Sequence, residues 1–260
     1  MNIFVFDIET VPDVDSGRKI HELGDLSDAD TAEAMFHLNR QKVGHEFLPH
    51  YLHKVVAISV VFRYRDTVKV WSLGDETSSE KDIVTRFFDG IDKYSPTLVS
   101  WNGGGFDLPV LHYRALKHGV SAPQYWDTGE LDGGFKWNNY LSRYHARHTD
   151  LMDLLAMYTG RANAPLDHIA TMLGFPGKMG MSGSKVWETF QNNDIKSIRD
   201  YCESDVLNTY LVYLKFELMR GRLTQLEFEK ECDLLKEQLQ RSGQSHLEEF
   251  LQYWNQASDE

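Results

Sequence analysis

The stretch that decides the fold is MNIFVFDIET, residues 1–10, and above all its apolar run NIFVFDI at 2–8. A short run rich in Phe, Val and Ile is typical of a buried β-strand. Side chains alternate along a strand, so Asp7 and Glu9 are expected on one face and Ile8 on the other. Two carboxylates on one face can share a metal ion, although such a pair also suits a solvated strand end.

Outward from this strand, the pattern alternates between strands and helices. Further strands are predicted at 55–64 and 67–73, joined as a hairpin, and at 97–101. Helical spacing and capping residues predict helices at about 31–42, 78–94, 106–118, 165–173, 184–191 and 194–220, with two more in the remaining tail. This mixture predicts an α/β fold with a mixed sheet.

Length and composition limit the organisation and the class of protein. With 260 residues and 42% hydrophobic residues, the chain can bury one substantial core. We expect one domain at 1–220, with a helical insertion at about 11–53, and a helical tail at 221–260 packed on it. The net charge of −12 argues against a protein that coats duplexes non-specifically, which would normally be basic. It does not exclude an enzyme that binds a strand end beside divalent cations.

The cysteines, the N-terminal sequence and the apolar runs indicate the cellular compartment. The two cysteines, Cys202 and Cys232, form no CxxC motif, so neither a disulfide framework nor a zinc site is indicated. The N-terminus lacks the basic segment of a signal peptide, and no apolar run approaches the ~18 residues of a membrane span. We therefore expect a cytoplasmic protein with no membrane partner.

A third acid, Asp107, follows three glycines in SWNGGGFDLP. It is predicted near the start of a helix, where the helix dipole favours an anion, and the glycines allow close backbone approach. An ordinary acid at a helix start would look the same. Asn102 and Phe106 flank the turn, where they could bind a sugar or phosphate and pack on a base, or serve as a turn asparagine and a core phenylalanine.

The last acid lies on the long helix predicted from residue 194. Tyr201 and Asp205 are four residues apart in YCESD, so both project from one helix face. A tyrosine hydroxyl beside a metal-bound carboxylate can hold a water molecule, although a surface tyrosine and a surface acid would show the same spacing. Carboxylates that gather at one place repel one another, and hard oxygen ligands suit Mg²⁺ or Mn²⁺.

Taken together, FDIET, NGGGFDLP and Tyr201-x-x-x-Asp205 resemble the three exonuclease motifs of the DEDD superfamily of 3′–5′ exonucleases, in its tyrosine subclass. The first two resemble the exonuclease domain of family B DNA polymerases, as does DLMDLLA at 150–156. The resemblance covers roughly residues 1–215 and includes no polymerase domain. The chain therefore resembles a stand-alone exonuclease of that lineage. This resemblance implies a ribonuclease H-like mixed sheet of five or six strands flanked by helices.

The resemblance also implies a site and a reaction. Asp7, Glu9 and Asp205 would hold one Mg²⁺ or Mn²⁺ ion, and Asp7 with Asp107, largely through water, a second. Tyr201 would orient the attacking water as nucleotides are removed from the 3′ end of a single-stranded nucleic acid, with DNA favoured. The expected partners are that strand and the nucleoside monophosphate product. Predicted substrate contacts are Thr10, Asn102, Phe106, Arg143 and Arg147.

Arg143 and Arg147 belong to a segment, 133–149, that contains no acid and interleaves cations with aromatic residues. This composition suits single-stranded nucleic acid. The aromatic residues could equally belong to the core, with the cations simply solvated.

Two other functions fit parts of the sequence. A nuclease-like fold can serve as a binding or interaction module without catalysis, and the acidic tail 221–260 could bind a partner or a second copy. A haloacid dehalogenase-like phosphatase has Asp-x-Asp-x-Thr after its first strand, but here Glu9 replaces the second Asp and Thr10 comes one place early. The choice between DNA and RNA, the processivity, the pathway and the oligomeric state are not determined by the sequence.

Overall fold

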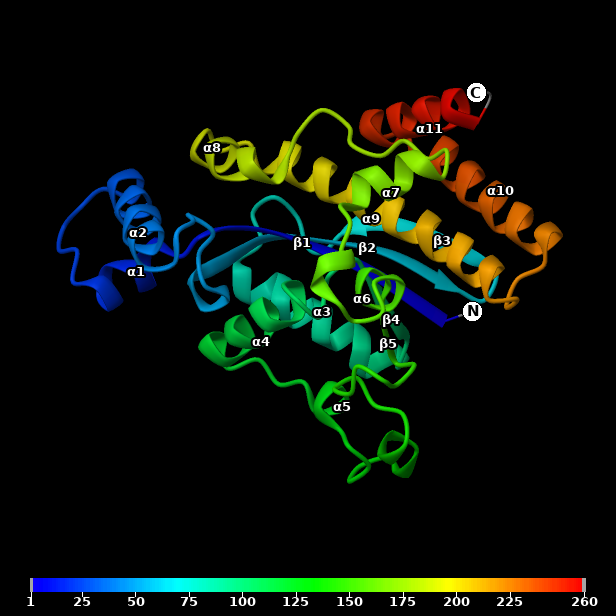
Figure 1. The fold of residues 1–260 in the computed structure, drawn as a ribbon, viewed down its shortest axis with the longest axis horizontal. Coiled ribbons are helices and arrows are strands. Elements are labelled where there is room, and N and C mark those ends of the chain that lie inside the picture. The colour runs from blue at the N-terminus through cyan, green and yellow to red at the C-terminus, as the bar shows by residue number, and fades with distance from the viewer. Residues whose placement is uncertain (1, 259–260) are drawn as a thin grey trace.

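The computed structural model describes residues 2–258, and its centre is a five-stranded mixed sheet (Figure 1). The strand order is β3-β2-β1-β4-β5, so the first strand of the chain lies in the middle. β1 pairs antiparallel with β2 and parallel with β4, and the hairpin β2-β3 and the parallel pair β4-β5 complete the sheet. The strands are Asn2–Pro12, His53–Tyr64, Thr67–Ser72, Thr97–Ser100 and His148–Asp150. The mixed α/β fold predicted from the sequence is confirmed.

β1 is buried on both of its faces, which explains its continuous apolar run. Phe4 and Phe6 pack with residues of α3 (Glu80–Tyr94) and α4 (Asp107–His118) on one side of the sheet. Ile3 and Val5 pack with residues of the long helix α9 (Ile195–Met219) on the other side. Figure 1 shows the sheet between these helical layers. Odd-numbered residues of β1 therefore face α9, and even-numbered residues face α3 and α4.

The first strand is longer than predicted, and it extends past the end of β4. It runs to Pro12 instead of residue 8, and its far half pairs only with β2, because β4 is four residues long and pairs with Ile3–Val5 alone. The pairing with β2 shifts between Glu9 and Thr10, which oppose Ala57 and Val55, so β2 carries one extra residue there. The acids thus lie within a strand whose β4-side edge is open.

The segment between β1 and β2 folds into two helices at one end of the sheet (Figure 1). They are α1 (Val14–His21) and α2 (Asp28–Val43), followed by a 3₁₀ turn at His50–Leu52. The predicted helix at 31–42 starts earlier because the side chain of Ser27 caps it, accepting a hydrogen bond from the Asp30 amide. A small separate core of Met35, Leu48 and Leu52 holds this segment together.

Short helices and 3₁₀ turns occupy most of the chain between α4 and α9. The helices predicted at 106–118, 165–173 and 184–191 are present, with bounds that differ by one or two residues. Strand β5, at His148–Asp150, lies in a region for which no strand was predicted. The short helices are α5 (Pro123–Trp126), α6 (Leu151–Leu155), α7 (Leu166–Met172) and α8 (Val186–Gln191), with 3₁₀ turns at Gly133–Lys136, Gly160–Ala162 and Gly183–Lys185.

The tail forms the two predicted helices, α10 (Gln225–Ser242) and α11 (Ser245–Ser258), beside α9 and β3 (Figure 1). Leu235, Leu239 and Phe250 are completely buried in the same hydrophobic cluster as the α9-facing side of β1. The Arg63 guanidinium of β2 binds both carboxylate oxygens of Glu231, at 2.6 and 2.8 Å. Within residues 2–258, no helix is both long enough and apolar enough to cross a membrane.

Candidate active site

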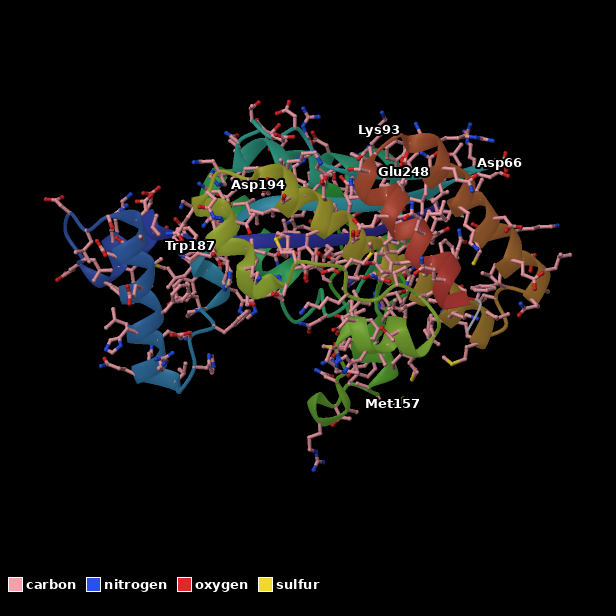
Figure 2. The ribbon with its side chains drawn as sticks, turned by 90° about the horizontal axis from the view of Figure 1, so that it is seen from above. Asp66, Lys93, Met157, Trp187, Asp194 and Glu248 are labelled. Atoms are coloured by element: carbon pink, nitrogen blue, oxygen red, sulfur yellow. The ribbon has the colours of Figure 1, made fainter. Side chains whose placement is uncertain are left out.

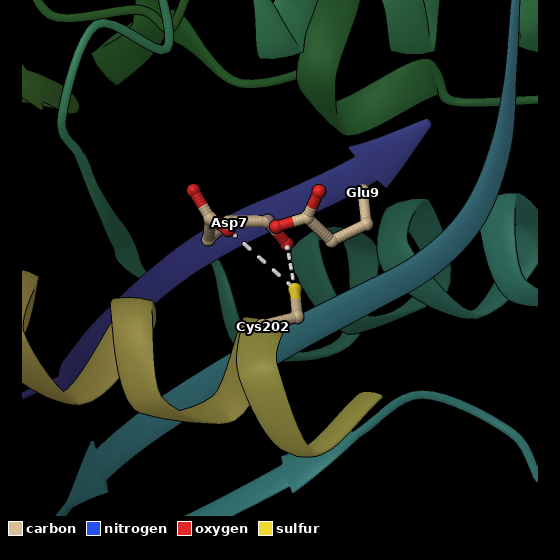
Figure 3. Close-up of side chains that lie close together, drawn as sticks. All are labelled: Asp7, Glu9 and Cys202. Carbon is tan, nitrogen blue, oxygen red and sulfur yellow. Dashed lines mark hydrogen bonds between the residues drawn. The ribbon is translucent and has the colours of Figure 1, made fainter. Parts of the chain in front are cut away.

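Asp7 and Glu9 lie together on the face of β1 that points toward α9, as strand alternation predicts (Figure 3). Asp7 is half-buried, and Glu9 is 8% exposed. One ligand atom from each, together with the Cys202 sulfur, lie within 4.8 Å of one another. The first strand therefore contributes two carboxylates to one spot.

Asp107 reaches the same strand from the other direction. It is the first residue of α4 and is 5% exposed. Its Oδ1 accepts a hydrogen bond of 3.2 Å from the backbone N–H of Ile8, the residue between the two strand acids. This bond spans 99 positions of sequence and fixes the start of α4 against the open edge of β1.

The turn before α4 is held by Asp150, at the end of β5. One oxygen of this carboxylate accepts the N–H of Asn102 at 3.0 Å, and the other accepts the N–H of Gly104 at 2.8 Å. Asp150 also caps α6, where it accepts the N–H of Asp153 at 3.3 Å. Gly103 is required by space, since a Cβ there would lie 2.3 Å from the Ser100 hydroxyl oxygen. The turn is thus rigidly positioned.

The third element is α9, which crosses above the carboxylates. Tyr201 and Asp205 lie one turn apart, close enough for each group to shift the pKa of the other. Cys202 is fully buried and also reaches the site. Its Sγ lies 3.4 Å from the backbone oxygen of Asp7 and 3.5 Å from Asp7 Oδ2 (Figure 3).

All four acids influence one another electrostatically. Burial, then the charges of Asp107, Glu9 and Asp205, hold the pKa of Asp7 well above its usual value. Burial and the charges of Asp205 and Asp107 do the same to the pKa of Glu9. Burial raises the pKa of Asp107 to about 7 and that of Asp205 to about 6. The four residues predicted from sequence are therefore gathered within interacting distance.

The chemistry of this donor set fits hard divalent cations. The ion pairs formed within residues 2–258 all join other side chains, so no arginine or lysine neutralises the four acids directly. Buried carboxylates that raise one another's pKa are stabilised by Mg²⁺ or Mn²⁺, which prefer oxygen ligands. Cys202 does not suit these ions, because burial raises the pKa of its thiol, which stays protonated as a hydrogen-bond donor.

A cavity of about 540 Å³ opens beside Glu9. Its volume is in the range of small-ligand pockets. Thr10 and Phe106, two of the predicted substrate contacts, line it. The remaining walls come from β1, α2, the 46–53 segment and the α8 region, and include the rings of Phe36, Phe47, His53 and Trp187. Figure 2 shows Trp187 between the α8 region and the helices α1 and α2.

The other predicted substrate contacts lie elsewhere. Asn102 is in the glycine turn with a left-handed backbone, φ 64°, and its N–H is bound by Asp150. Arg143 is half exposed, pairs with Asp153 at 2.9 Å and lies over the Tyr158 ring. Arg147 lies 3.9 Å above the Phe135 ring centre and donates to the backbone oxygens of Asn138 and Ser95.

The segment 133–149 is therefore partly core. Phe135 and Tyr140 are buried, at 0% and 2% exposure, so the interpretation of these two rings as stacking surfaces is wrong. Trp137 and Tyr144 are both 77% exposed and remain accessible. The structure brings Thr10 and Phe106 to the acids' neighbourhood and gives Arg147 a structural position.

Comparison with known proteins agrees with this architecture. Residues 45–254 match the model of a family described as a predicted 3′–5′ exonuclease related to the exonuclease domain of PolB. The matched range contains Asp107, Tyr201 and Asp205, whereas Asp7 and Glu9 precede it.

Relatives of known name are DNA polymerases. DNA polymerase 1 of Sulfurisphaera ohwakuensis is 26% identical over 162 residues, which are 58% of this chain and 18% of the polymerase. DNA polymerase 1 of Sulfolobus acidocaldarius is 27% identical over 161 residues, again 58% of this chain and 18% of the polymerase. The chain therefore spans less than a fifth of the length of these relatives.

The solved structure of the family B DNA polymerase from Pyrobaculum calidifontis has a similar fold. It matches 93% of this chain and 29% of its own, with a TM-score of 0.50 and 18% identity. The fold is thus consistent with the ribonuclease H-like sheet implied by the motifs. Because the family model covers most of its length, the chain belongs to the family of predicted 3′–5′ exonucleases related to the exonuclease domain of PolB.

Proposed function

We propose that this chain is a metal-dependent 3′–5′ exonuclease that removes nucleotides from the end of a single-stranded nucleic acid. The observation that carries the proposal is the convergence of Asp7, Glu9, Asp107 and Asp205 from three elements, with no cationic side chain of residues 2–258 paired to them. DNA is the favoured substrate, since the named relatives are DNA polymerases. The expected product is a nucleoside monophosphate.

The acids divide into two sets of ligands. Asp7, Glu9 and Asp205 would hold one Mg²⁺ or Mn²⁺ ion, and Asp7 with Asp107 a second. When bound, the ions would supply an activated water and stabilise charge on the attacking and leaving oxygens. The chain itself places Asp107 through the Ile8 amide and places Asp205 through α9.

Tyr201 would position the attacking water and would not act as its base. Burial, together with the nearby charges of Asp205 and Glu9, raises the pKa of its hydroxyl well above the ordinary value. The group therefore stays protonated at neutral pH and acts as a hydrogen-bond donor beside Asp205. Its role is to hold the attacking water in line with the terminal phosphodiester.

Of the predicted substrate contacts, we keep Thr10, Phe106, Asn102 and Arg143. Thr10 and Phe106 line the cavity beside Glu9, and Asn102 lies at the turn that leads into α4. Arg143 is accessible at a second, smaller cavity that also borders Gly104. The guanidinium of Arg147 contacts backbone oxygens and the Phe135 ring, so we infer that Arg147 stabilises the fold and does not bind the substrate.

The test is digestion of single-stranded DNA and RNA of equal sequence, labelled at either end, with Mn²⁺ or Mg²⁺ and with a chelator. We expect the 5′-labelled strand to shorten stepwise and the 3′ label to be released at once as a mononucleotide. The chelator and the substitution Asp7→Asn should abolish both. Binding of the strand without cleavage in Mn²⁺ would contradict the proposal and favour a binding module.

A further inference from the structure

An apolar groove lies between the long helix α9 and the short helices α6 and α7. Its volume is about 470 Å³. α7 packs against α9 beside the groove, as Figure 1 shows. Of the described residues that line it, Lys215 alone is charged, and all the others are apolar. None of these lining residues belongs to the proposed metal ligands or substrate contacts, so the groove is separate from the candidate active site.

Two helices each contribute an apolar stripe to this groove. On α9, Val212, Phe216 and Met219 line it, and their spacing of four and three residues puts them on one helix face. On α7, Ile169 and Met172 line it at a spacing of three. Met172 and Met219 are 71% and 68% exposed, so the described chain does not cover this surface. Two adjacent apolar stripes form the kind of groove that receives the apolar face of an amphipathic helix.

The charged groups at the edge of the groove are cations. The Lys215 ammonium lies 4.4 Å from the centre of the Phe228 ring, and within residues 2–258 it forms no ion pair. The Arg220 guanidinium lies 4.9 Å from the centre of the Phe216 ring, which lines the groove. Arg220 also pairs with Glu217 at 2.5 Å, and its side chain is 40% exposed. A ligand of this groove therefore meets positive charge at the α9 side.

We propose that the groove between α7 and α9 docks an amphipathic helix of a partner protein, with acidic residues beside its apolar face. The apolar side chains of that helix pack between the two stripes, where the flexible side chains of Met172 and Met219 adapt to their shape. Its carboxylates pair with Lys215 and Arg220. The inference does not depend on the proposed exonuclease function.

Charge decides between this occupant and a second copy of the chain. A two-fold contact through the same groove would bring Lys215 and Arg220 of both copies together, and like charges would repel across it. The net charge of −12 repels any acidic partner at long range. Salt screens exposed charges beyond about 8–10 Å, however, so the cations at the groove dominate once the helix is close.

The experiment uses three designed, fluorescently labelled peptides of about 16 residues, a length at which an isolated helix begins to form. The first has leucines spaced three and four residues apart and glutamates on the other face. The second replaces the glutamates by lysines, and the third keeps the glutamates but scrambles the leucines. Fluorescence anisotropy with the full chain measures each dissociation constant. We expect the first peptide to bind at micromolar concentration, about tenfold more tightly than either of the others.

Variants place the binding in the groove. Met219→Glu introduces a charge among the apolar stripes and should weaken binding of the acidic peptide about tenfold. Lys215→Glu should reverse the preference, so that the basic peptide binds more tightly. Leu116→Glu is the matched control, because Leu116 is an apolar residue of α4 that is 81% exposed and lies outside the groove. It should leave the affinity at the wild-type value, and thermal melts check that all three variants are folded.

Three results would overturn the inference: equal binding of the acidic and basic peptides, binding of neither, or an unchanged affinity in Met219→Glu. Sedimentation at the same protein concentrations tests the second copy. Self-association that is lost in Met219→Glu would assign the groove to a second copy and would also overturn the inference. All these readouts are independent of nuclease activity, so a negative digestion assay would overturn only the exonuclease proposal.

Discussion

Asp7 is the residue on which the two proposed metal positions meet. It belongs to both proposed ligand sets, whereas the proposed role of Tyr201 is only to orient water, so the two substitutions should differ. Asp7→Asn should lower kcat by roughly a thousandfold or more, and Tyr201→Phe by about 10- to 100-fold. Single-turnover assays at saturating Mn²⁺ measure both. An equal loss in the two variants, at equal metal occupancy, would refute this division of labour.

Cys202, on α9, contacts Asp7 directly. Its thiol contacts both the backbone oxygen and a carboxylate oxygen of Asp7, and this hydrogen bond lowers the pKa of the acid, against the larger effect of burial. Cys202→Ala should therefore raise the Mn²⁺ concentration needed for half-maximal activity a few-fold. Cys202→Ser, which keeps a donor, should not. An unchanged requirement in the alanine variant would show that the contact has no effect on the metal.

Local periodicity in the sequence predicted how the acids are placed, but not which residues contact them and their neighbours. Strand alternation was enough to place Asp7 and Glu9 on one face, and helical spacing placed Tyr201 beside Asp205. No role at the site was predicted for Cys202, because the sequence does not show how closely α9 crosses β1. His53 was missed because its bond to Thr10 spans 43 positions, and nothing in the polar 11–53 segment marks it.

Among the elements, the glycine turn depends on strand β5 through a single carboxylate. Asp150→Ala would leave the N–H groups of Asn102, Gly104 and Asp153 without this acceptor. We expect a loss of about 3 kcal/mol in unfolding free energy. Activity should also fall, since Asp107 is placed by the same turn. Denaturant unfolding and the digestion assay measure the two effects.

A matched control is available in another loop. Asp127 accepts backbone N–H groups from four residues, Gly129 to Asp132, in the connection after α5. Asp127→Ala should loosen that loop and leave the rate per folded molecule near the wild-type value. If Asp150→Ala behaved in the same way, the turn would not position the site.

The elements themselves were largely predictable because their signals are local. The hairpin, the capped helix α3 and the helix that ends at Gly119, φ 64°, follow from residues next to one another in the chain. Strand β5 was missed because three residues carry no pattern of their own and form a strand only by pairing with β4. The extra length of β1 was missed because Asp7 and Glu9 interrupt the apolar run.

For the molecule as a whole, the acid cluster couples stability to pH and to metal. Burial raises the pKa of Asp107 to about 7 and that of Asp205 to about 6, from an ordinary value of 3.8. The folded, metal-free protein therefore holds more protons than the unfolded chain between about pH 4 and pH 7. Their contribution to stability is fully present below pH 4 and is lost as the pH rises through 6 and 7.

Divalent cations should reverse this loss. Because binding requires ionised carboxylates, the rise in melting temperature caused by Mn²⁺ should grow between pH 5 and pH 8. Thermal melts with and without the ion measure it, with Asp107→Asn and Asp205→Asn as variants in which the pH dependence should weaken. A rise in melting temperature that is the same at pH 5 and pH 8 would show that these groups do not bind the ion.

The unequal lengths of the central strands have one further consequence. β1 has eleven residues and β4 has four, so the two run side by side over three positions only. If β4 were as long as β1, it would cover the edge of β1 at Ile8, and Asp107 could not reach the Ile8 amide. The open edge of β1 at Ile8 is thus an outcome of where β4 stops, and insertions that lengthen β4 should be tolerated worse than insertions in the outer loops.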